Sequence, residues 1–240
     1  MKRVLIRPSR GINPLQFTEL WEYRELLYFL VWRDVIVLYK QTVLGASWAI
    51  LQPVLGALVF NLFFGILMKV PSGDLPYPVF VYAGLLPWQL FSRSLSESTN
   101  SLVASQQLVK KVFFPKLLLP IAPVIGGLVD FAFAFMVLIG MMFFYGIRPT
   151  AAIILLPALV CLAVLTALAA GVWLSALNVR YRDVRYTVPF LTQLWFFATP
   201  IVYASSIVPE KWRPLLGLNP MAGVIEGFRW ALFGSGPPPG

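Results

Sequence analysis

The chain has 240 residues, of which 59% are hydrophobic and only 12% are charged, and its mean hydropathy is +0.78. A soluble domain carries about 25% charged residues, so this shortfall, spread over several long uncharged runs, indicates a membrane protein. The chain has no histidine, which excludes imidazole metal ligands and histidine bases, and its single cysteine, Cys161, excludes an intrachain disulfide.

The first predicted element is an amphipathic helix over residues 14–40. Asn13 is a plausible N-cap and is followed by a proline, which is common at the first helical position. Glu19, Glu22 and Glu25 recur at helical spacing, opposite apolar and aromatic side chains. This pattern predicts a helix lying along the inner membrane face, and a helix facing water is the alternative.

Five stretches then follow that are suited to crossing a membrane. A helix needs about 20 apolar residues to cross roughly 30 Å of hydrocarbon. The predicted spans are residues 44–68, 75–100, 117–145, 153–177 and 188–204, of which the second begins apolar and continues as a polar helix.

Two of these spans carry features of their own. Asp130 interrupts the third span, and because a carboxylate at that depth costs about 3 kcal/mol, it is expected to face protein, water or a partner. The fourth span has small residues at a spacing of four, which permits close helix contact within one subunit or at a dimer seam: Ala163, Ala167, Gly171 and Ser175.

The basic residues predict the orientation. With the N-terminus in the cytoplasm, 14 of the 19 lysines and arginines lie in the inner segments. Basic residues are concentrated in cytoplasmic segments of membrane proteins, so this orientation is expected. The net charge of +9 is then mainly a topology signal, and a nucleic-acid partner is not expected.

The end of the chain predicts a segment that does not cross the membrane. A short helix starts at Asn219 and Pro220 and ends before Gly234, and it carries Glu226 and Arg229 one turn apart. It is too short and too charged to span, so residues 205–234 are interpreted as an outer re-entrant or interfacial segment.

The sequence shows no enzyme motif. No GxxxxGK[ST] motif occurs, and there is no Ser-His-Asp set, metal-ligand cluster or pair of carboxylates in one segment. We therefore expect no catalysis by this chain, and any energy for its function must come from elsewhere.

Four stretches, in order along the chain, resemble signatures of one protein family. They are WRDVIVLYKQTVLGASWAILQP (32–53), LVKKVFFPKLLLP (108–120), ALNVRYRDVRYTVPFLTQLWFFATPIVY (176–203) and LNPMAGVIEGFRWALFG (218–234). Together they resemble the type-2 ABC transporter permeases that export polysaccharides such as O-antigen, teichoic acid and capsule. The resemblance extends from about residue 17 to residue 235.

This resemblance implies an all-α polytopic membrane protein with a single permease domain over residues 1–240. The implied assembly is a homodimer in the inner membrane, where membrane lipids surround it. Two copies of a cytoplasmic ABC ATPase subunit are expected to bind this homodimer. The implied substrate is a lipid-linked polysaccharide, with O-antigen favoured. No cofactor is expected on this chain, because ATP and Mg²⁺ belong to the partner subunit. The family pattern adds a sixth helix after FRWALFG, and its absence is interpreted as clipping of the sequence.

The resemblance also assigns cytoplasmic contacts. Residues 105–115 are implied to form a coupling helix that docks on the ATPase through Val109, Lys110, Lys111, Val112, Phe113, Phe114 and Pro115. A second contact is expected at Arg180, Tyr181, Arg182 and Asp183, and the interface helix would contribute Trp21, Glu22, Arg24, Trp32, Arg33 and Asp34. The alternative is that these charges only set the topology.

Aromatic and polar side chains within the spans are candidates for a sugar path, because aromatic faces stack on the C–H faces of pyranose rings. The candidates are Trp48, Phe60, Asn61, Phe63, Phe64, Trp195 and Phe196. The outer gate is expected at Trp212, Asn219, Pro220, Glu226 and Arg229. The alternative for the aromatics is lipid-facing bulk and interfacial belts.

Three other functions are weighed against this one. A type-2 ABC permease for drugs or lipids would share the spans but not the joint occurrence of VKKVFFP and NVRYRDV. An ion-driven secondary transporter would show more charge within the membrane and paired interrupted helices. An intramembrane enzyme would need a cluster of catalytic acids or histidines.

Overall fold

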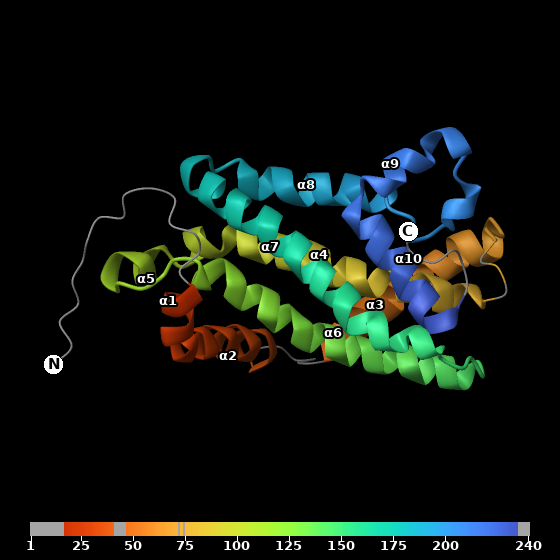
Figure 1. Cartoon of the computed structure of the whole chain (residues 1–240), viewed down its shortest axis with the longest axis horizontal. Helices are drawn as coiled ribbons and strands as arrows, with labels where there is room; N and C mark the ends of the chain where they lie inside the picture. The colour runs from red at the N-terminus through yellow and green to blue at the C-terminus, as the bar shows by residue number, and fades with distance from the viewer. Residues whose placement is uncertain (1–16, 41–46, 72, 74, 235–240) are drawn as a thin grey trace.

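The computed structural model of the protein describes residues 17–40, 47–71, 73 and 75–234. Within these residues the regular secondary structure is helical, with no strand. The predicted helix start at Asn13 lies outside the described residues. Figure 1 shows an elongated bundle, with the N-terminal helices and α5 at one end and α9 and α10 at the other.

The helices follow one another closely along the chain. They are α1 (Phe17–Glu22), α2 (Arg24–Lys40), α3 (Ser47–Phe60), the π-helix η1 (Asn61–Leu67), α4 (Tyr77–Ala104), α5 (Gln106–Lys111), α6 (Leu118–Phe144), the 3₁₀ helix η2 (Ala151–Leu155), α7 (Leu156–Arg180), α8 (Val184–Phe197), the 3₁₀ helices η3 (Ser205–Ile207) and η4 (Glu210–Trp212), α9 (Arg213–Gly217) and α10 (Pro220–Phe233).

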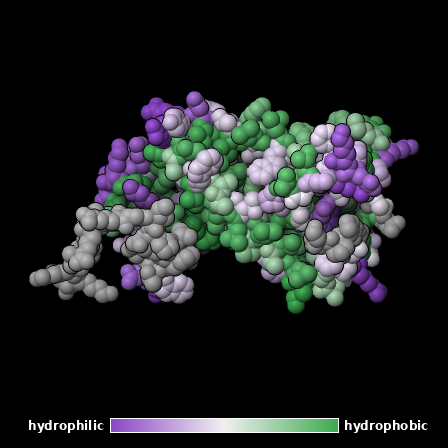
Figure 2. Space-filling view, turned by 45° about the horizontal axis from the view of Figure 1, so that its top comes forward, coloured by the Kyte–Doolittle hydropathy of each residue, from purple (hydrophilic) through white to green (hydrophobic). Residues whose placement is uncertain are grey.

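In the part of the chain that the structure describes, three helical segments are long and apolar enough to cross a membrane, judged by length and composition. They are Ile50–Leu67, Leu118–Phe144 and Ala151–Arg180, which correspond to the first, third and fourth predicted spans. The second predicted span is the 28-residue helix α4, which carries Arg93 and Glu97 within its length. Figure 2 agrees with a membrane setting, because apolar side chains cover the middle of the visible face and hydrophilic ones gather towards its two ends.

The fifth predicted span, residues 188–204, is shorter than expected as a helix. Helix α8 ends at Phe197, and residues 198–204 form turns. Proline cannot donate a backbone hydrogen bond and disfavours helical geometry in the residue before it, so Pro200 stops the helix near Thr199. The carbonyl groups of Pro200 and Ile201 instead accept hydrogen bonds from Arg229.

Helix α4 occupies the centre of the bundle. It packs against α3, α6, α7 and α10, and Figure 1 shows it running along α7 and α6. Its first half, from Tyr77 to Trp88, is almost entirely buried. This half of α4 is apolar on nearly all sides, and a helix of that kind is stable where neighbouring helices surround it.

Small residues let α4 approach its two main neighbours closely. A Cβ atom on Gly171 of α7 would lie 2.6 Å from the Ser98 Oγ of α4, and one on Gly127 of α6 would lie 3.2 Å from the Ser94 Oγ. Gly171 belongs to the predicted stripe of small residues, all four of which are buried. The stripe therefore packs within the chain, against α4, as the favoured interpretation expected.

The predicted N-terminal helix is divided into two pieces. Helix α1 ends at Glu22 and α2 begins at Arg24. Leu30 of α2 is buried in a small apolar cluster with Phe114 and with Leu118 of α6. This cluster attaches α2 to the base of α6, so that the N-terminal helices and the segment before α6 form one unit.

The close contact at Gly171 predicts a selective loss of stability. Gly171→Leu forces the side chain into Ser98, so we expect it to lower the free energy of unfolding by about 1–3 kcal/mol, as overpacking does. Gly140→Leu on α6 is the matched control, since a Cβ atom at Gly140 meets nothing within 4 Å. Thermal unfolding of the purified protein in detergent measures both, and equal midpoints would contradict the close packing of α4 and α7.

Candidate functional site

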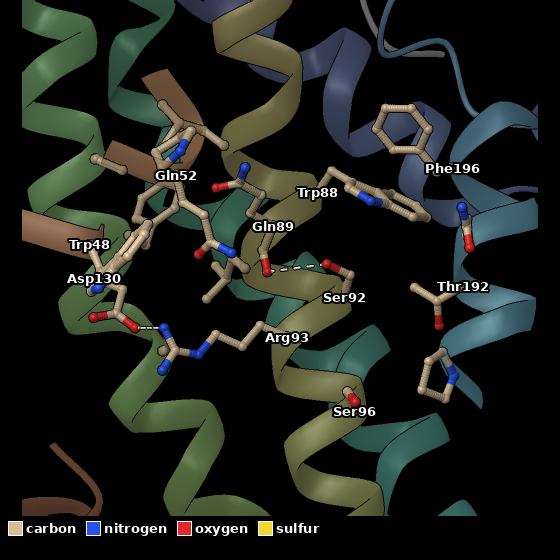
Figure 3. A pocket seen from close by; sticks show the side chains of 18 residues that line it. Trp48, Gln52, Trp88, Gln89, Ser92, Arg93, Ser96, Asp130, Thr192 and Phe196 are labelled. Atoms are coloured by element: carbon tan, nitrogen blue, oxygen red, sulfur yellow. Dashed lines mark hydrogen bonds and ion pairs between the residues drawn. The ribbon is translucent and has the colours of Figure 1, made fainter. Parts of the chain in front are cut away.

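A cavity of about 880 Å³ opens between helices α3, α4, α6 and α8. Figure 3 shows side chains from these helices converging on it. Its wall combines three kinds of group: aromatic rings, uncharged polar side chains and one pair of opposite charges. The polar and aromatic lining residues are Trp48, Gln52, Trp88, Gln89, Ser92, Arg93, Ser96, Asp130, Phe131, Thr192, Gln193 and Phe196.

An ion pair joins α4 to α6 in the wall of this cavity. Arg93 donates from Nη1 to the Asp130 carboxylate (Figure 3). Its Nε also donates to Glu97 Oε1 at 2.8 Å. The Asp130 side chain is only 13% exposed, so its charge is largely removed from solvent. The expectation that Asp130 faces protein is therefore confirmed, because a charge at that depth is stable only when paired.

Two of the predicted path residues line the cavity. Trp48 lies at the start of α3 and is 46% exposed, and Phe196 lies near the end of α8. Phe60 stacks on Phe196 with ring centroids 5.6 Å apart, so it extends this aromatic surface without lining the cavity.

The other path candidates lie elsewhere. Asn61, Phe63 and Phe64 belong to η1 and do not line the cavity. Trp195 also lies outside the lining: its ring packs edge-on against Phe91 with centroids 5.0 Å apart, and its Nε1 donates to Asn219 Oδ1 at 2.9 Å.

Sequence reasoning missed several residues of this cavity. Gln89, Ser92 and Ser96 project from α4 at helical spacing, and Arg93 lies among them. Arg93 was counted only as a basic residue of an inner segment, whereas it lies within α4. The lone carboxylate of Asp130 was the signal that could have found it, since such a group requires a nearby cation.

The predicted coupling helix over residues 105–115 is shorter than expected, because α5 ends at Lys111 and Val112 is extended. The two phenylalanines that follow point in opposite directions. Val112 and Phe113 follow α5 and are 50% and 72% exposed, whereas Phe114 is only 5% exposed. Lys110 and Lys111 end α5 and are exposed. Phe114 is buried, whereas Val109 and Pro115 are partly buried. Val109 packs against the apolar cluster that contains Leu30 and Phe114.

The second predicted cytoplasmic contact lies at the same end of the bundle. Arg180 ends α7, and Tyr181, Arg182 and Asp183 are exposed between α7 and α8. Asn178 Nδ2 donates to the Thr99 carbonyl at 3.0 Å, which holds the end of α7 against the last turns of α4 that lead into α5. Figure 1 shows α5 and the junction of α7 and α8 at one end.

The interface residues surround an exposed aromatic surface on α1 and α2. Trp21 is 71% exposed and lies under the Arg24 guanidinium, 5.6 Å from its carbon, while Trp32 stacks on Tyr28. Arg33 pairs with Asp34 at 2.7 Å, and Glu22 is exposed. Exposed tryptophan and tyrosine beside arginine are typical of the headgroup region of a membrane.

At the α10 end of the bundle, Asn219 fixes the start of α10. Its side chain accepts from the Met221 amide at 3.1 Å and from Trp195, and it donates to Thr199 Oγ1 at 2.9 Å. Pro220 occupies the first helical position, as the sequence predicted. Trp212, by contrast, lies in η4 with 54% of its surface exposed.

Arg229 is buried at the α10 end of the bundle. Its guanidinium donates to the carbonyl oxygens of Phe80 at 3.2 Å, of Pro200 at 2.8 Å and of Ile201. Gly84 gives it room, because a Cβ atom there would lie 2.5 Å from Arg229 Nη2. These bonds tie α10 to α4 and to the turn after α8.

The environment of Arg229 acts on its charge in two directions. Burial lowers the pKa of Arg229, and the nearby Glu226 and Tyr77 raise it. An arginine keeps its proton in proteins, so the buried charge must be met by its surroundings. The three carbonyl groups and the partly buried Glu226, one turn earlier on α10, provide this compensation.

A helical bundle with apolar spans, hydrophilic ends and a cavity that holds polar and charged groups is consistent with a helical membrane protein. Residues 25–233 match the family described as ABC-2 type transporter. The chain therefore belongs to the ABC-2 type transporter family. Membrane permeases of this family work with an ATPase on a separate subunit, and the chain is accordingly a transport component of the membrane.

Three relatives indicate its closer kinship. The chain is 36% identical over 215 residues to the O-antigen export system permease protein RfbA of Myxococcus xanthus, and the aligned region covers 88% of this chain and 81% of that protein. It is 33% identical over 206 residues to the protein of the same name from Klebsiella pneumoniae, covering 85% and 79%. It is 26% identical over 205 residues to the polysialic acid transport protein KpsM of Escherichia coli, covering 83% and 78%.

Removal of Arg229 is expected to destabilise the α10 end of the bundle severely. Arg229→Leu leaves three carbonyl groups without their donor and Glu226 without its countercharge, so we expect a loss of at least about 3 kcal/mol in unfolding free energy. Arg213→Leu is the control, because Arg213 is exposed and lies 3.9 Å from an exposed Glu210 carboxylate; it should cost less than about 1 kcal/mol. Thermal unfolding in detergent compares them, and similar losses would refute the anchoring role of Arg229.

Proposed function

We propose that this chain is the permease subunit of an ATP-driven exporter that moves a lipid-linked O-antigen polysaccharide from the cytoplasm across the inner membrane. The observation that carries this proposal is the 36% identity to an O-antigen export permease over 88% of the chain. The cavity supports it, since aromatic rings, amides and hydroxyl groups in one wall suit a hydroxyl-rich substrate.

The energy for transport is proposed to come from a separate subunit. The sequence contains no Walker motif, so this chain has no P-loop with which to bind a nucleotide. ATP and Mg²⁺ are proposed to bind the ATPase partner, and no cofactor is proposed for this chain. Rigid-body motion of that partner would be transmitted through α5 and the N-terminal helices to the spans.

The proposed topology places the N-terminus, α5 and the junction of α7 and α8 in the cytoplasm. This follows from the excess of lysine and arginine in these segments. Helices α4 and α8 are proposed as the second and fifth crossings, in addition to the three apolar spans. The segment from η3 to α10 is proposed to lie at the outer face and to gate the path there.

Two copies of this chain, with two ATPase subunits, form the proposed transporter. The support is an apolar surface that the single chain leaves open: Leu62 and Phe63 of η1 and Phe190 of α8 are about half exposed or more. Lipid covers part of such a surface, and a second copy is proposed to cover the part beside the cavity.

One other substrate class has a specific observation in its favour. The relative from Escherichia coli is named as a polysialic acid transport protein, and it covers nearly the same part of this chain. Its identity of 26%, against 36% and 33% for the two O-antigen permeases, makes an acidic capsule polysaccharide the second candidate.

Transport by the reconstituted protein tests the proposed function. We expect proteoliposomes that contain this permease and its cognate ATPase to move a lipid-linked O-antigen upon addition of ATP and Mg²⁺. Proteoliposomes with the permease alone should move none, because this chain has no nucleotide site of its own. Movement without the ATPase would refute the energy source, and movement only of an acidic capsule polysaccharide would refute the substrate class.

The opposite directions of Phe113 and Phe114 give a matched test of docking. Phe113→Ala removes an exposed ring, so we expect normal thermal stability but at least tenfold less ATPase subunit recovered with the permease. Phe114→Ala removes a buried ring and should lower the unfolding free energy by about 3–5 kcal/mol.

Charge reversal at the same surface provides a second test of docking. Lys110→Glu combined with Lys111→Glu should leave the permease inserted but reduce O-antigen export, since rim charges orient a docking partner. Undiminished ATPase recovery and export in both this variant and Phe113→Ala would exclude docking at this segment.

A further inference from the structure

The charged and polar groups of the cavity lie together in a distinct part of its wall. Arg93 and Ser96 project from α4, and Asp130 faces them from α6. Trp48 and Gln52 border this part from α3 (Figure 3). All lie nearer to the α5 end of the bundle than to the α10 end, because Trp48 begins α3 and Arg93 lies past the middle of α4.

The charged groups at this wall do not form a binding site for an anion. Among the described lining residues Arg93 is the one cation. It is already bonded to Asp130, which also lines the cavity, and to Glu97, which lies beside the lining. Two carboxylates around one guanidinium give the cluster a net charge of about −1 at neutral pH. An incoming phosphate would therefore have to displace a carboxylate from Arg93 and remain near both negative groups, which is electrostatically unfavourable.

The same groups suit hydroxyl groups well. Carboxylate oxygens accept hydrogen bonds from hydroxyls, a guanidinium donates to them, and the amides of Gln52, Gln89 and Gln193 can do both. Bonds to charged partners are stronger than neutral ones, so a hydroxyl-rich ring gains most beside Arg93 and Asp130. Trp48, with about half of its surface exposed, offers a ring face at the border of the same wall.

We propose that Trp48, Gln52, Arg93 and Asp130 form a subsite that binds an uncharged sugar ring of the exported glycan through its hydroxyl groups. The phosphate groups of a lipid carrier are proposed to bind elsewhere. This inference rests on the proposed function, because it names the part of the substrate that this cavity accepts. The Arg93–Asp130 pair acts here as a pre-arranged donor and acceptor, held in place by the packing of α4 against α6.

Binding of two matched probes tests the subsite. The permease–ATPase complex in nanodiscs is titrated calorimetrically with a neutral mannose tetrasaccharide and with the same tetrasaccharide carrying a terminal phosphate. We expect the neutral probe to bind the wild-type complex about tenfold more tightly, because the phosphate meets two carboxylates. Gln52→Leu should weaken binding of the neutral probe about fivefold.

Substitution of Asp130 separates recognition from a structural role. Asp130→Asn keeps the shape and removes one negative charge, so the ratio of the two affinities should shift by about tenfold towards the phosphorylated probe. If the ion pair had only a structural role, Asp130→Asn would weaken the binding of both probes equally. Thr166→Val is the control, because the Thr166 hydroxyl lies outside the cavity and donates to the Leu162 carbonyl at 2.8 Å; it should leave both affinities unchanged.

Three outcomes would overturn the subsite. They are tighter binding of the phosphorylated probe by the wild type, an unchanged affinity ratio in Asp130→Asn, or no binding of either probe by a complex that transports O-antigen. In the last case the proposed function stands and the subsite alone fails. A wild-type complex that binds the neutral probe but transports no O-antigen would instead refute the proposed function.

Discussion

The guanidinium of Arg229 donates hydrogen bonds to three carbonyl oxygens on two segments far apart in the chain, Phe80 of α4 and Pro200 and Ile201 after α8. In a setting that excludes water, an unpaired backbone carbonyl or an isolated charge is costly, so donor and acceptors depend on one another. The end of α8, the start of α4 and the whole of α10 are therefore fixed together. Since α4 and α8 also line the cavity, its shape depends on this buried arginine at the other end of the bundle.

Helix α4 serves two purposes on two faces. Ser94 and Ser98 face Gly127 and Gly171, where small side chains let three helices pack closely. Arg93, which directly precedes Ser94 in the sequence, projects into the cavity instead. The helical period of 3.6 residues places neighbouring residues on different faces, so one helix is both a rigid support and a polar wall. A support of this kind holds the Arg93–Asp130 pair in place without any flexible loop.

The segment that follows α5 connects the surface to the interior in two residues. Phe113 projects outward, whereas Phe114 is buried with Leu30 and Leu118. A partner that displaces the exposed ring would move the buried one, and with it α2 and the base of α6. In the proposed transporter, this contact would link docking of the ATPase subunit to the spans.

The sequence by itself determined the membrane class, the helical character and, through four ordered signatures, the family. Length and hydropathy are properties of contiguous residues, so spans 117–145 and 153–177 could be predicted almost to their ends. The end of α8, the partner of Asp130 and the inward direction of Phe114 could not, because each depends on residues distant in the chain. The position of Asp130 in a span predicted that its carboxylate has a partner, but only the packing of α4 against α6 places Arg93 beside it. The tertiary structure decided which polar groups share a wall, since their convergence arises from helices that meet in space and not from their spacing in sequence.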